Sequence, residues 1–545
     1  MTDLSVCAYS PGTVRDAAAH AETHLAVLAP HLRAPFRDAL PTAAAAVGRR
    51  LLGALWREDI ADTRSRYGGT GHPHAFDRVD FDTVPADDPI ALLPHSIVDG
   101  RGWTLAAELA NAVTNLAIAY ARRDTAPAPG DGPDAAAVAL ERLAIDGHNL
   151  HPCGRTRIGW DVDDVLAHDL EAGATRIGFV AVRRDAHVGD DLGFLDGAPP
   201  APPGYVVQPV HAWQRDAVLA RRYPDLLRDG TLRILDGTLP AVPTAALRTL
   251  LLPGGDYLKL SLDIQVTSTR RSISVASTRN GPVLSALLTR LLAGEERVVL
   301  LAETAGAALG GSRDASAILR DGLAGHLTPG ERVIPGGALP LVVGDLLREY
   351  GGSPLDFLTD YARLVLPPLL RLATRYGIAL EAHLQNCLPT FIAGTPHRLV
   401  LRDLAGMRLH RPRLAAAGIE PALWPGSVIG TDDLYTMRAK LGYTAFQAHL
   451  GELVIALGSH GLDEATAWRA VREVVDEAYD PLRADPTTAR AADADHAAFT
   501  APRVPHKALV RMRLTGGGDV YLPVQNPLHA VQNPLHTVRN PLHAP

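Results

Sequence analysis

The stretch that decides the fold is Tyr257-Leu-Lys259-Leu-Ser-Leu-Asp-Ile-Gln-Val-Thr267, followed by Ser-Thr-Arg-Arg271. Apolar and polar residues alternate along it, which predicts a β-strand over 256–275 with one core face and one polar face. Lys259 and Thr267 share the polar face, but an extended strand holds them roughly 26 Å apart. Thr267 and Arg271 are closer partners, since a hydroxyl and a guanidinium can bind one anion together.

Lysine is rare in this chain. Only Lys259, Lys440 and Lys507 occur among 53 lysines and arginines. Such a sequence is expected to keep lysine where a compact ammonium does what a planar guanidinium cannot. We therefore predict that Lys259 binds a phosphate or carboxylate; the alternative is an ordinary solvated strand residue.

The composition limits the classes of protein to consider. With 545 residues, two to four domains are expected. A net charge of −7 without a basic stripe argues against nucleic acid as a partner. No signal peptide and no apolar run of membrane-spanning length is visible. The three cysteines, Cys7, Cys153 and Cys387, are far apart and indicate a cytoplasmic protein without disulfides.

The rest of the chain alternates helical and strand-like segments. Helices are expected over 13–60, 104–123, 282–293, 340–376 and most of 411–485; strands are expected over 176–183, 204–210, 378–388 and 398–403. Residues 524–545 repeat Gln/Arg-Asn-Pro-Leu-His three times at a period of seven. The prolines exclude a coiled coil and favour a disordered or strand-like tail.

A predicted hairpin in the second half carries metal-binding residue types. Glu381, His383 and Gln385 alternate along its first strand, and symmetry about Gly394-Thr395 would place Asn386 opposite Asp403. Two hard oxygens suit Mg²⁺ when phosphates and water complete its coordination. The alternative is an ordinary polar face with a capping aspartate.

Two further segments offer cations. Loop 147–160 carries His148, His151, Arg155 and Arg157; without a third ligand nearby, anion binding by the arginines is favoured over a metal. Arg248-Thr249 repeats the pairing of guanidinium and hydroxyl. For each pair the alternative is a surface ion pair of little energetic value. No Walker A loop, dinucleotide fingerprint or nucleophile elbow accompanies them.

Taken in order, these motifs resemble the IucA/IucC family of NRPS-independent siderophore synthetases. The order holds from about 147 to 513, with three departures: Asn149 replaces a proline, Arg155 a lysine and Ala246 a serine. The matching segments are Gly147–Gly159, Gln208–Gln214, Ala246–Thr249, Lys259–Arg271, Glu381–Asn386, Arg402–Gly406 and Lys507–Arg513.

The resemblance implies an α+β fold likened to a cupped hand. It implies a mainly helical thumb (1–145), β-rich fingers (146–320), a palm (321–523) and the repetitive tail (524–545). Members activate a carboxylic acid, often citrate, with ATP; they form an acyl-adenylate, release pyrophosphate and pass the acyl group to an amine or hydroxyl. Dimers are common in the family, so a homodimer is an open expectation.

Roles for individual residues follow from the same resemblance. Catalytic roles fall on Lys259, Arg271 and His383. ATP contacts fall on Arg155, Arg157, Arg248, Thr249, Lys259, Thr267, Arg271 and His383. Substrate contacts fall on His151, Thr267, Arg271, Lys507 and Arg513, and Mg²⁺ on Glu381, Asn386 and Asp403. Two alternatives stay open: the same ligase chemistry in another natural-product pathway, or a degenerate binding homologue without catalysis.

Overall fold

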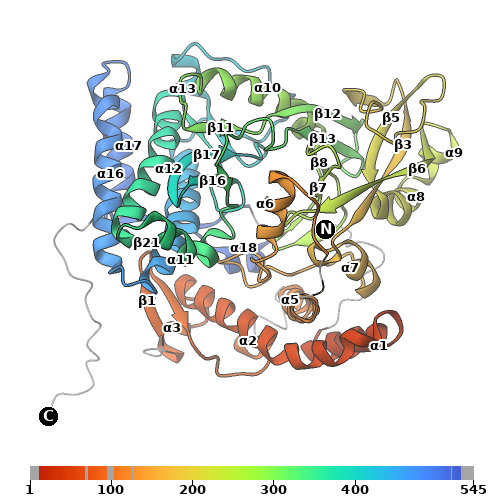
Figure 1. Cartoon of the computed structure of the whole chain (residues 1–545), viewed down its shortest axis with the longest axis horizontal. Helices are drawn as coiled ribbons and strands as arrows, with labels where there is room; N and C mark the ends of the chain where they lie inside the picture. The colour runs from red at the N-terminus through yellow and green to blue at the C-terminus, as the bar shows by residue number, and fades with distance from the viewer. Residues whose placement is uncertain are drawn as a thin grey trace.

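The N-terminal part of the chain forms a helical layer, the thumb, which lies along one side of the molecule (Figure 1). The structure is a computed structural model, and it describes residues 12–67, 71–94, 103–123, 125, 127–516 and 518–529. Thr13 begins the first helix by accepting a hydrogen bond from the backbone N–H of Asp16. The elements of this layer are α1 (Val14–Leu28), η1 (Pro30–Leu32), α2 (Arg33–Glu58), α3 (Thr63–Arg66), β1 (Gly71–His74), β2 (Arg78–Phe81), η2 (Pro89–Leu92) and α5 (Trp103–Ala121). The helix α6 (Pro133–Glu141) lies apart from this layer, in the middle of the molecule, where it packs against the strands of the fingers and the palm (Figure 1).

The fingers are built on an eight-stranded antiparallel sheet with strand order β4-β12-β13-β8-β7-β6-β3-β5. The strands expected near 176–183 and 204–210 are confirmed as β3 and β5. The sheet strands are β3 (Thr175–Arg183), β4 (His187–Gly189), β5 (Tyr205–His211), β6 (Leu232–Pro243), β7 (Thr249–Leu251), β8 (Tyr257–Leu260), β12 (Glu303–Leu309) and β13 (Ser316–Arg320). Helical segments around it are α7 (Val162–His168), η3 (Leu170–Ala172), η4 (Gln214–Leu219), α8 (Ala220–Arg222), α9 (Pro224–Arg228) and α10 (Val275–Leu291).

The prediction of one long strand over 256–275 is wrong. The chain leaves the sheet after Leu260 and forms a small hairpin of β9 (Gln265–Val266) and β10 (Thr269–Arg270). Thr267 sits at its tip with φ 57°, a left-handed conformation that ends an extended strand. The apolar positions of the alternating pattern are still buried, because Leu262, Ile264 and Val266 pack into the thumb core instead of the core of the sheet.

The palm contains a four-stranded sheet of order β11-β17-β16-β14, with helices packed around it. The helix expected over 340–376 is two helices: Gly351 (φ 72°) ends the first, and Ser353 with Asp356 forms a capping box that starts the second. The strands of the palm, which also form a three-stranded and a two-stranded sheet, are β11 (Val298–Leu300), β14 (Arg332–Val333), β15 (Ile378–Ala379), β16 (Cys387–Ile392), β17 (Thr395–Leu401), β18 (Arg408–His410), β19 (Gly430–Thr431), β20 (Arg503–Lys507) and β21 (Tyr521–Gln525). Its helices are α11 (Leu339–Tyr350), α12 (Pro354–Tyr376), α13 (Arg411–Ala416), α14 (Leu434–Leu441), η5 (Gly442–Leu450), α15 (Gly451–Gly458), α16 (Glu464–Ala484), α17 (Ala489–Phe499) and α18 (Leu509–Thr515).

Fingers and palm are interleaved in the sequence. β11 lies before the proposed boundary at 320, yet it pairs in parallel with β17 of the palm before the chain returns to the fingers as β12 and β13. The tail also begins later than expected: Gln525 is the last residue of β21, and Leu528 is only 2% exposed. The first copy of the repeat is therefore part of the fold, and the later copies lie outside the described residues.

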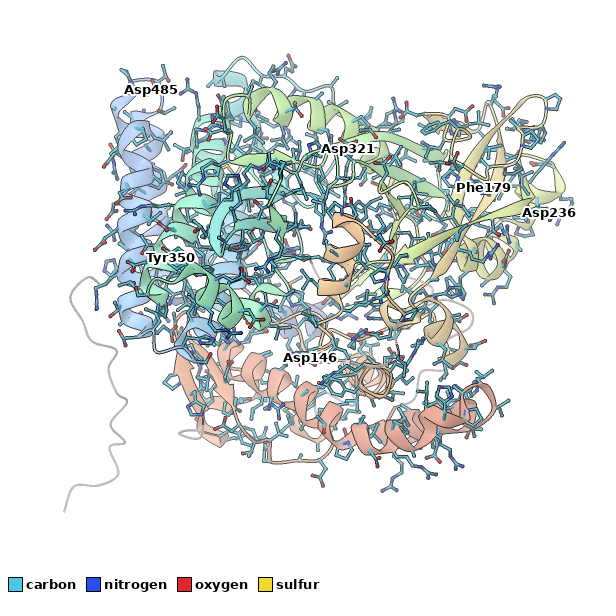
Figure 2. The ribbon with its side chains drawn as sticks, in the orientation of Figure 1. Asp146, Phe179, Asp236, Asp321, Tyr350 and Asp485 are labelled. Carbon is cyan, nitrogen blue, oxygen red and sulfur yellow. The ribbon has the colours of Figure 1, made fainter. Side chains whose placement is uncertain are left out.

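Asp146 fastens the thumb to the loop that follows it. Its carboxylate accepts hydrogen bonds from Arg50 on α2 (2.7 Å) and Tyr120 on α5 (2.6 Å). Figure 2 labels Asp146 above the thumb helices, at the edge of the remaining fold. Across the described residues, no helix combines the length and the apolarity needed to cross a membrane.

Candidate active site

A cavity brings together loop 147–157, the 265–271 hairpin and the 383–385 turn of the palm. These segments are distant in sequence, so the cavity exists only in the folded chain. The side chains used below that line it are His148, Arg155, Arg157, Thr267, Arg271, His383 and Arg402.

Lys259 and Asp403 form an ion pair between fingers and palm. The Lys259 Nζ lies 2.7 Å from Oδ1 and 2.8 Å from Oδ2 of Asp403. The lysine side chain is 1% exposed and the aspartate side chain 23%. Burial alone would raise the pKa of Asp403, but Lys259, Arg320 and Arg248 together hold that pKa well below its ordinary value. The lysine strand and the palm hairpin thus meet at one electrostatic centre.

Arg271 is a half-buried cation available to an anionic ligand. It lines the cavity, and its Nε is buried without a hydrogen-bond partner among the described residues. Burial, followed by repulsion from Arg248 and Arg157, lowers the pKa of Arg271 to about 9. An unpaired buried guanidinium costs free energy until a carboxylate or phosphate pairs with it.

Arg248 and Thr249 stand beside Lys259. Thr249 on β7 pairs directly with Lys259 on β8, so their side chains share one face of the sheet. Arg248 donates from Nη1 to the backbone oxygen of Ser272 (3.1 Å), and burial lowers its pKa. The positive groups assigned to the Lys259 strand are therefore clustered, as the sequence indicated.

The bend at Thr267 changes the geometry assumed for that strand. Thr267 and Arg271 both line the cavity, because the hairpin returns the chain and the Arg271 N–H bonds the oxygen of Ile264 (2.9 Å). The Thr267 hydroxyl donates to the backbone oxygen of Val266 (2.5 Å). Its oxygen can still accept from a ligand, but Thr267 and Lys259 do not lie on one extended strand.

The palm hairpin is offset by one residue from the symmetric prediction. Cys387 pairs with Leu401, and the Arg402 N–H bonds the oxygen of Asn386 (3.1 Å), so Asn386 faces Arg402 rather than Asp403. The turn lies at Ala393-Gly394, one position before the predicted one, because Ile392 pairs with Thr395; the irregularity between Pro389 and Phe391 compensates for only part of this difference.

The residues before this hairpin form a turn instead of a strand, which corrects the expectation that they share a strand face. Glu381 binds the ammonium of Lys440 (2.9 Å) and lies 3.9 Å from the His383 ring. Burial raises the pKa of Glu381, but Lys440 and His383 overcome this effect and bring it to about 2. Asn386 donates from its amide to the Glu381 backbone oxygen (3.1 Å), which brings two of the three expected metal ligands together.

The two arginines of the loop form ion pairs within the protein. Arg157 binds Asp169 through Nε (2.8 Å) and Nη2 (3.1 Å), and Arg155 pairs with Glu171 and Asp169. Both arginines are nearly fully buried. Buried carboxylates pair with both guanidinium groups, which support the cavity wall, and a contact of these arginines with ATP stays a prediction.

Two residues that were expected to contact substrate also have hydrogen-bond partners within the protein. His151 is 2% exposed; its Nε2 meets the Ser268 hydroxyl (2.6 Å) and its Nδ1 accepts from the Cys153 N–H (3.0 Å). Arg513 pairs with Glu108 through Nε (3.0 Å) and Nη2. Both side chains support the fold in this arrangement, and their contact with substrate stays a prediction.

Each lysine of the chain forms an ion pair with a carboxylate. Besides Lys259 with Asp403 and Lys440 with Glu381, Lys507 binds Asp519 (2.8 Å). Lys440 was not assigned a role from the sequence, although the scarcity of lysine was a signal that could have identified it.

Arg320 was also missed. Its Nη2 lies 3.0 Å from Glu303 and 3.5 Å from Asp403, and its position at the end of β13 gave no motif to recognise.

Two family models match parts of this chain. Residues 136–340 match the model of the IucA / IucC family. The matched part contains both Lys259 and Arg271. Residues 355–521 match a second model, described as ferric iron reductase FhuF-like transporter.

A curated relative and two solved structures are similar to larger parts of this chain. D-ornithine–citrate ligase of Staphylococcus aureus is 26% identical over 375 residues, which cover 60% of this chain and 57% of that protein. The petrobactin biosynthesis protein AsbB of Bacillus anthracis gives a TM-score of 0.78 at 19% identity and covers 91% of this chain and 98% of that one. ATP-bound aerobactin synthetase IucA of Klebsiella pneumoniae gives 0.64 at 20% identity, with 81% and 84% covered. The expected α+β architecture of this family is confirmed.

Proposed function

We propose that this protein is an ATP-dependent ligase that activates a carboxylic acid, citrate or a related polycarboxylate, and joins it to an amine or hydroxyl in siderophore biosynthesis. The observation that carries the proposal is the half-buried Arg271, whose Nε has no hydrogen-bond partner among the described residues, together with the Lys259–Asp403 pair. Such a site favours a polyanion, and the IucA/IucC relatives include a citrate ligase and an ATP-bound synthetase.

Positively charged side chains would act in the first step of the reaction. Attack of a carboxylate on the α-phosphate of ATP breaks its bond to the leaving pyrophosphate and builds negative charge on the phosphate oxygens. Arg271, Arg248 and Lys259 supply the positive charge that would stabilise these oxygens. The product of this step is an acyl-adenylate, and an amine or hydroxyl then displaces AMP from it.

His383 can receive the proton that the amine loses. Burial lowers the pKa of His383, so the ring is neutral at neutral pH and its nitrogen is able to accept a proton. The nearby Glu381 would stabilise the imidazolium that forms. This role is additional to the contact with ATP expected from the sequence.

Magnesium fits the site by donor type. Glu381, Asp403 and the amide oxygen of Asn386 are hard oxygen donors, of the kind Mg²⁺ takes alongside phosphates. Lysine ammonium groups neutralise both carboxylates in this structure. A bound Mg²⁺ would supply further positive charge for the triphosphate, so Lys259 and Lys440 would shift from their carboxylates toward the ligand.

The FhuF-like match does not lead us to propose iron reduction. Four thiolates hold the common iron–sulfur clusters, whereas this chain has three cysteines, of which Cys153 and Cys387 are buried and far apart in sequence. A pathway other than siderophore synthesis would use the same ligase chemistry with a different acid or amine. A degenerate binding homologue remains the third candidate.

A carboxylate screen tests the proposal. Purified enzyme with ATP and Mg²⁺ is assayed for ATP–pyrophosphate exchange with citrate, 2-oxoglutarate or succinylated hydroxamate acids, before any amine is added. We expect exchange with one acid class, its loss in Lys259→Ala and Arg271→Met, and no change in the exposed control Arg228→Met. Binding of ATP without exchange or pyrophosphate release for any acid would support the degenerate homologue instead.

A further inference from the structure

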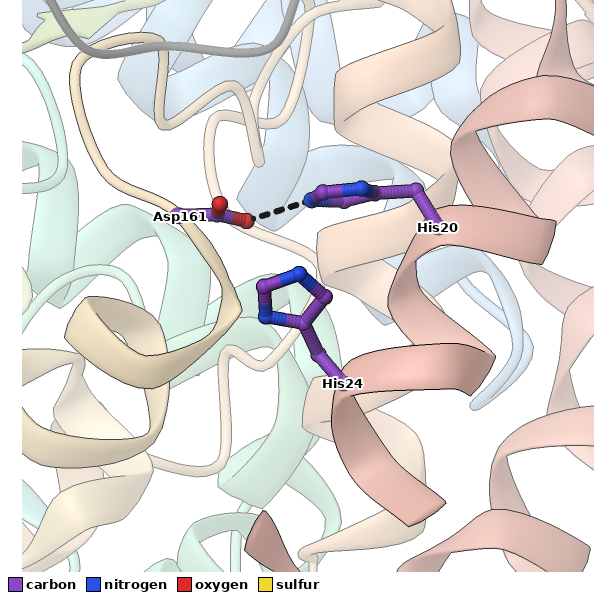
Figure 3. Close-up of side chains that lie close together, drawn as sticks. All are labelled: His20, His24 and Asp161. Carbon is purple, nitrogen blue, oxygen red and sulfur yellow. Dashed lines mark hydrogen bonds and ion pairs between the residues drawn. The ribbon is translucent and has the colours of Figure 1, made fainter. Parts of the chain in front are cut away.

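Two histidines and one aspartate meet where α1 approaches the start of α7. His20 and His24 are one helical turn apart on α1, so their rings leave the same face of the helix. Asp161 is the residue immediately before α7. Figure 3 shows both rings directed toward this carboxylate.

The distances bring three donor atoms together. His20 Nε2 lies 2.8 Å from Asp161 Oδ1, and the two imidazole centroids are 4.3 Å apart. One ligand atom from each residue can be chosen so that all three lie within 4.8 Å of one another. Zinc bonds of roughly 2.0–2.2 Å place tetrahedral ligand atoms about 3.4 Å apart. The His20–Asp161 pair at 2.8 Å would open slightly, and separations as large as 4.8 Å would close by up to about 1.4 Å, changes that side-chain rotation can supply.

The carboxylate is held in place before any ion arrives. Asp161 Oδ1 also accepts from the Val162 N–H (2.7 Å), and the Asp164 side chain binds the Asp161 N–H (3.2 Å) to complete a capping box. Fixed orientation of a ligand by its own hydrogen bonds is what metal sites require. The side chains of His20 and Asp161 are 25% and 28% exposed, so an ion can reach them from solvent.

An ordinary ion pair between His20 and Asp161 would explain the contact between these two residues. It does not explain His24. Within the described residues, the His24 imidazole makes no hydrogen bond, yet its ring packs against His20 next to the carboxylate. A cation shared by all three side chains accounts for the position of both rings.

We propose that His20, His24 and Asp161 form a site for a divalent transition-metal ion of the zinc class. Two imidazole nitrogens and one carboxylate oxygen are typical zinc ligands, and a water molecule would complete the tetrahedron. The ion joins α1 of the thumb to the segment that continues from the cavity wall at Arg157 through Trp160 to Asp161. Its role is to fasten these two parts, separately from the ligase chemistry proposed above.

Metal titration of the full-length protein tests the site. The protein is stripped with a chelator and titrated with Co²⁺, whose visible absorption reports low-symmetry coordination, and Zn²⁺ is then used as a competitor. We expect one Co²⁺ per chain with visible bands, displaced by Zn²⁺. We also expect His24→Ala and His20→Ala to weaken binding by about 100-fold or more, beyond what loss of a supporting partner costs.

Three comparisons make the result specific. Asp161→Asn keeps a good helix-capping side chain but removes the carboxylate charge, so it should weaken binding without unfolding α7. His31→Ala removes an exposed imidazole on η1 and should bind as wild type does. All variants retain the histidines of the tail and the carboxylates near Lys259, so only a difference between variants reports this site.

Thermal unfolding gives an independent readout. Zn²⁺ at a concentration well above its Kd should raise the Tm of the wild type and of His31→Ala, but not that of His24→Ala. Equal Co²⁺ spectra and equal Tm shifts in wild type and His24→Ala would overturn the proposal, as would the absence of stoichiometric binding at micromolar metal. Neither measurement uses ATP or an acid, so the result is independent of the proposed ligase activity.

Discussion

Lys259 and Asp403 are 144 positions apart in the sequence, and the ammonium of one binds both carboxylate oxygens of the other, at 2.7 and 2.8 Å. The pair joins β8 of the fingers to the residue that follows β17 of the palm. The environment of its members is unequal: Lys259 is buried, whereas Asp403 is partly exposed and has Arg320 3.5 Å away. Loss of either partner therefore has different consequences.

Asp403→Ala should destabilise the protein more than Lys259→Met does. Without Asp403, a buried ammonium is left uncompensated, at a cost of about 3–5 kcal/mol. Without Lys259, Asp403 still has Arg320 and some water. We expect the double variant to be more stable than Asp403→Ala alone, as measured by urea-induced unfolding. Strict additivity of the two single changes would contradict this coupling.

Arg271 and Arg157 provide a matched test of a ligand-binding and a structural arginine. Arg271→Met removes a cation whose Nε is unpaired, so we expect the Tm to be unchanged or higher and the KM for ATP or the acid to rise at least tenfold. Arg157→Met leaves buried Asp169 without its bidentate partner, so its Tm should fall markedly. Thermal unfolding and initial rates on both variants check the pair; equal loss of Tm would remove the distinction.

The sequence located the segment around Lys259 correctly, but it did not predict the backbone conformation of that segment. The alternation around Lys259 located the right segment, but it could not reveal that Leu262, Ile264 and Val266 pack against the thumb rather than within the sheet. Alternation reports which residues are buried, and it does not report which surface covers them. The turn at Thr267 follows from that packing, and no glycine or proline marks it in the sequence.

Ion pairing between distant segments was also invisible in the sequence. Arg155 and Arg157 look like anion-binding residues until Asp169 and Glu171 are placed beside them. The palm hairpin was nearly correct, but its turn lies one residue earlier than predicted, and one irregularity in the strand compensates for only part of that error, so Asn386 is offset by a single position. Register depends on such irregularities, which the pattern of side chains does not specify.

Acid should weaken the Lys440–Glu381 contact at a defined pH. The pKa of Glu381 is about 2 in the folded protein, against an ordinary value of 4.5. A depressed carboxyl pKa stabilises the fold at pH above 4.5, and this contribution is lost as the pH falls from 4.5 toward 2. The full difference corresponds to about 3 kcal/mol. Glu381→Gln should be less stable than wild type at pH 7, and the difference should shrink below pH 4, as followed by denaturant unfolding at several pH values.

Asn526, in the first copy of the C-terminal repeat, tests how far the ordered fold extends. Its side-chain amide donates to the backbone oxygens of Phe499 (2.9 Å) and Ala501 (2.7 Å), and its own oxygen accepts from the Leu528 N–H (3.2 Å). Asn526→Ala should cost about 1–3 kcal/mol, because two buried carbonyl groups lose their donor. That cost predicts release of the C-terminal segment by limited proteolysis about 5- to 150-fold faster than in wild type. Asn533→Ala, at the same position of the second copy, is the matched control and should leave the rate unchanged. If the second copy can replace the first, Asn526→Ala alone will be silent and only the double variant will release the segment faster, because both copies carry the same Asn-Pro-Leu-His sequence.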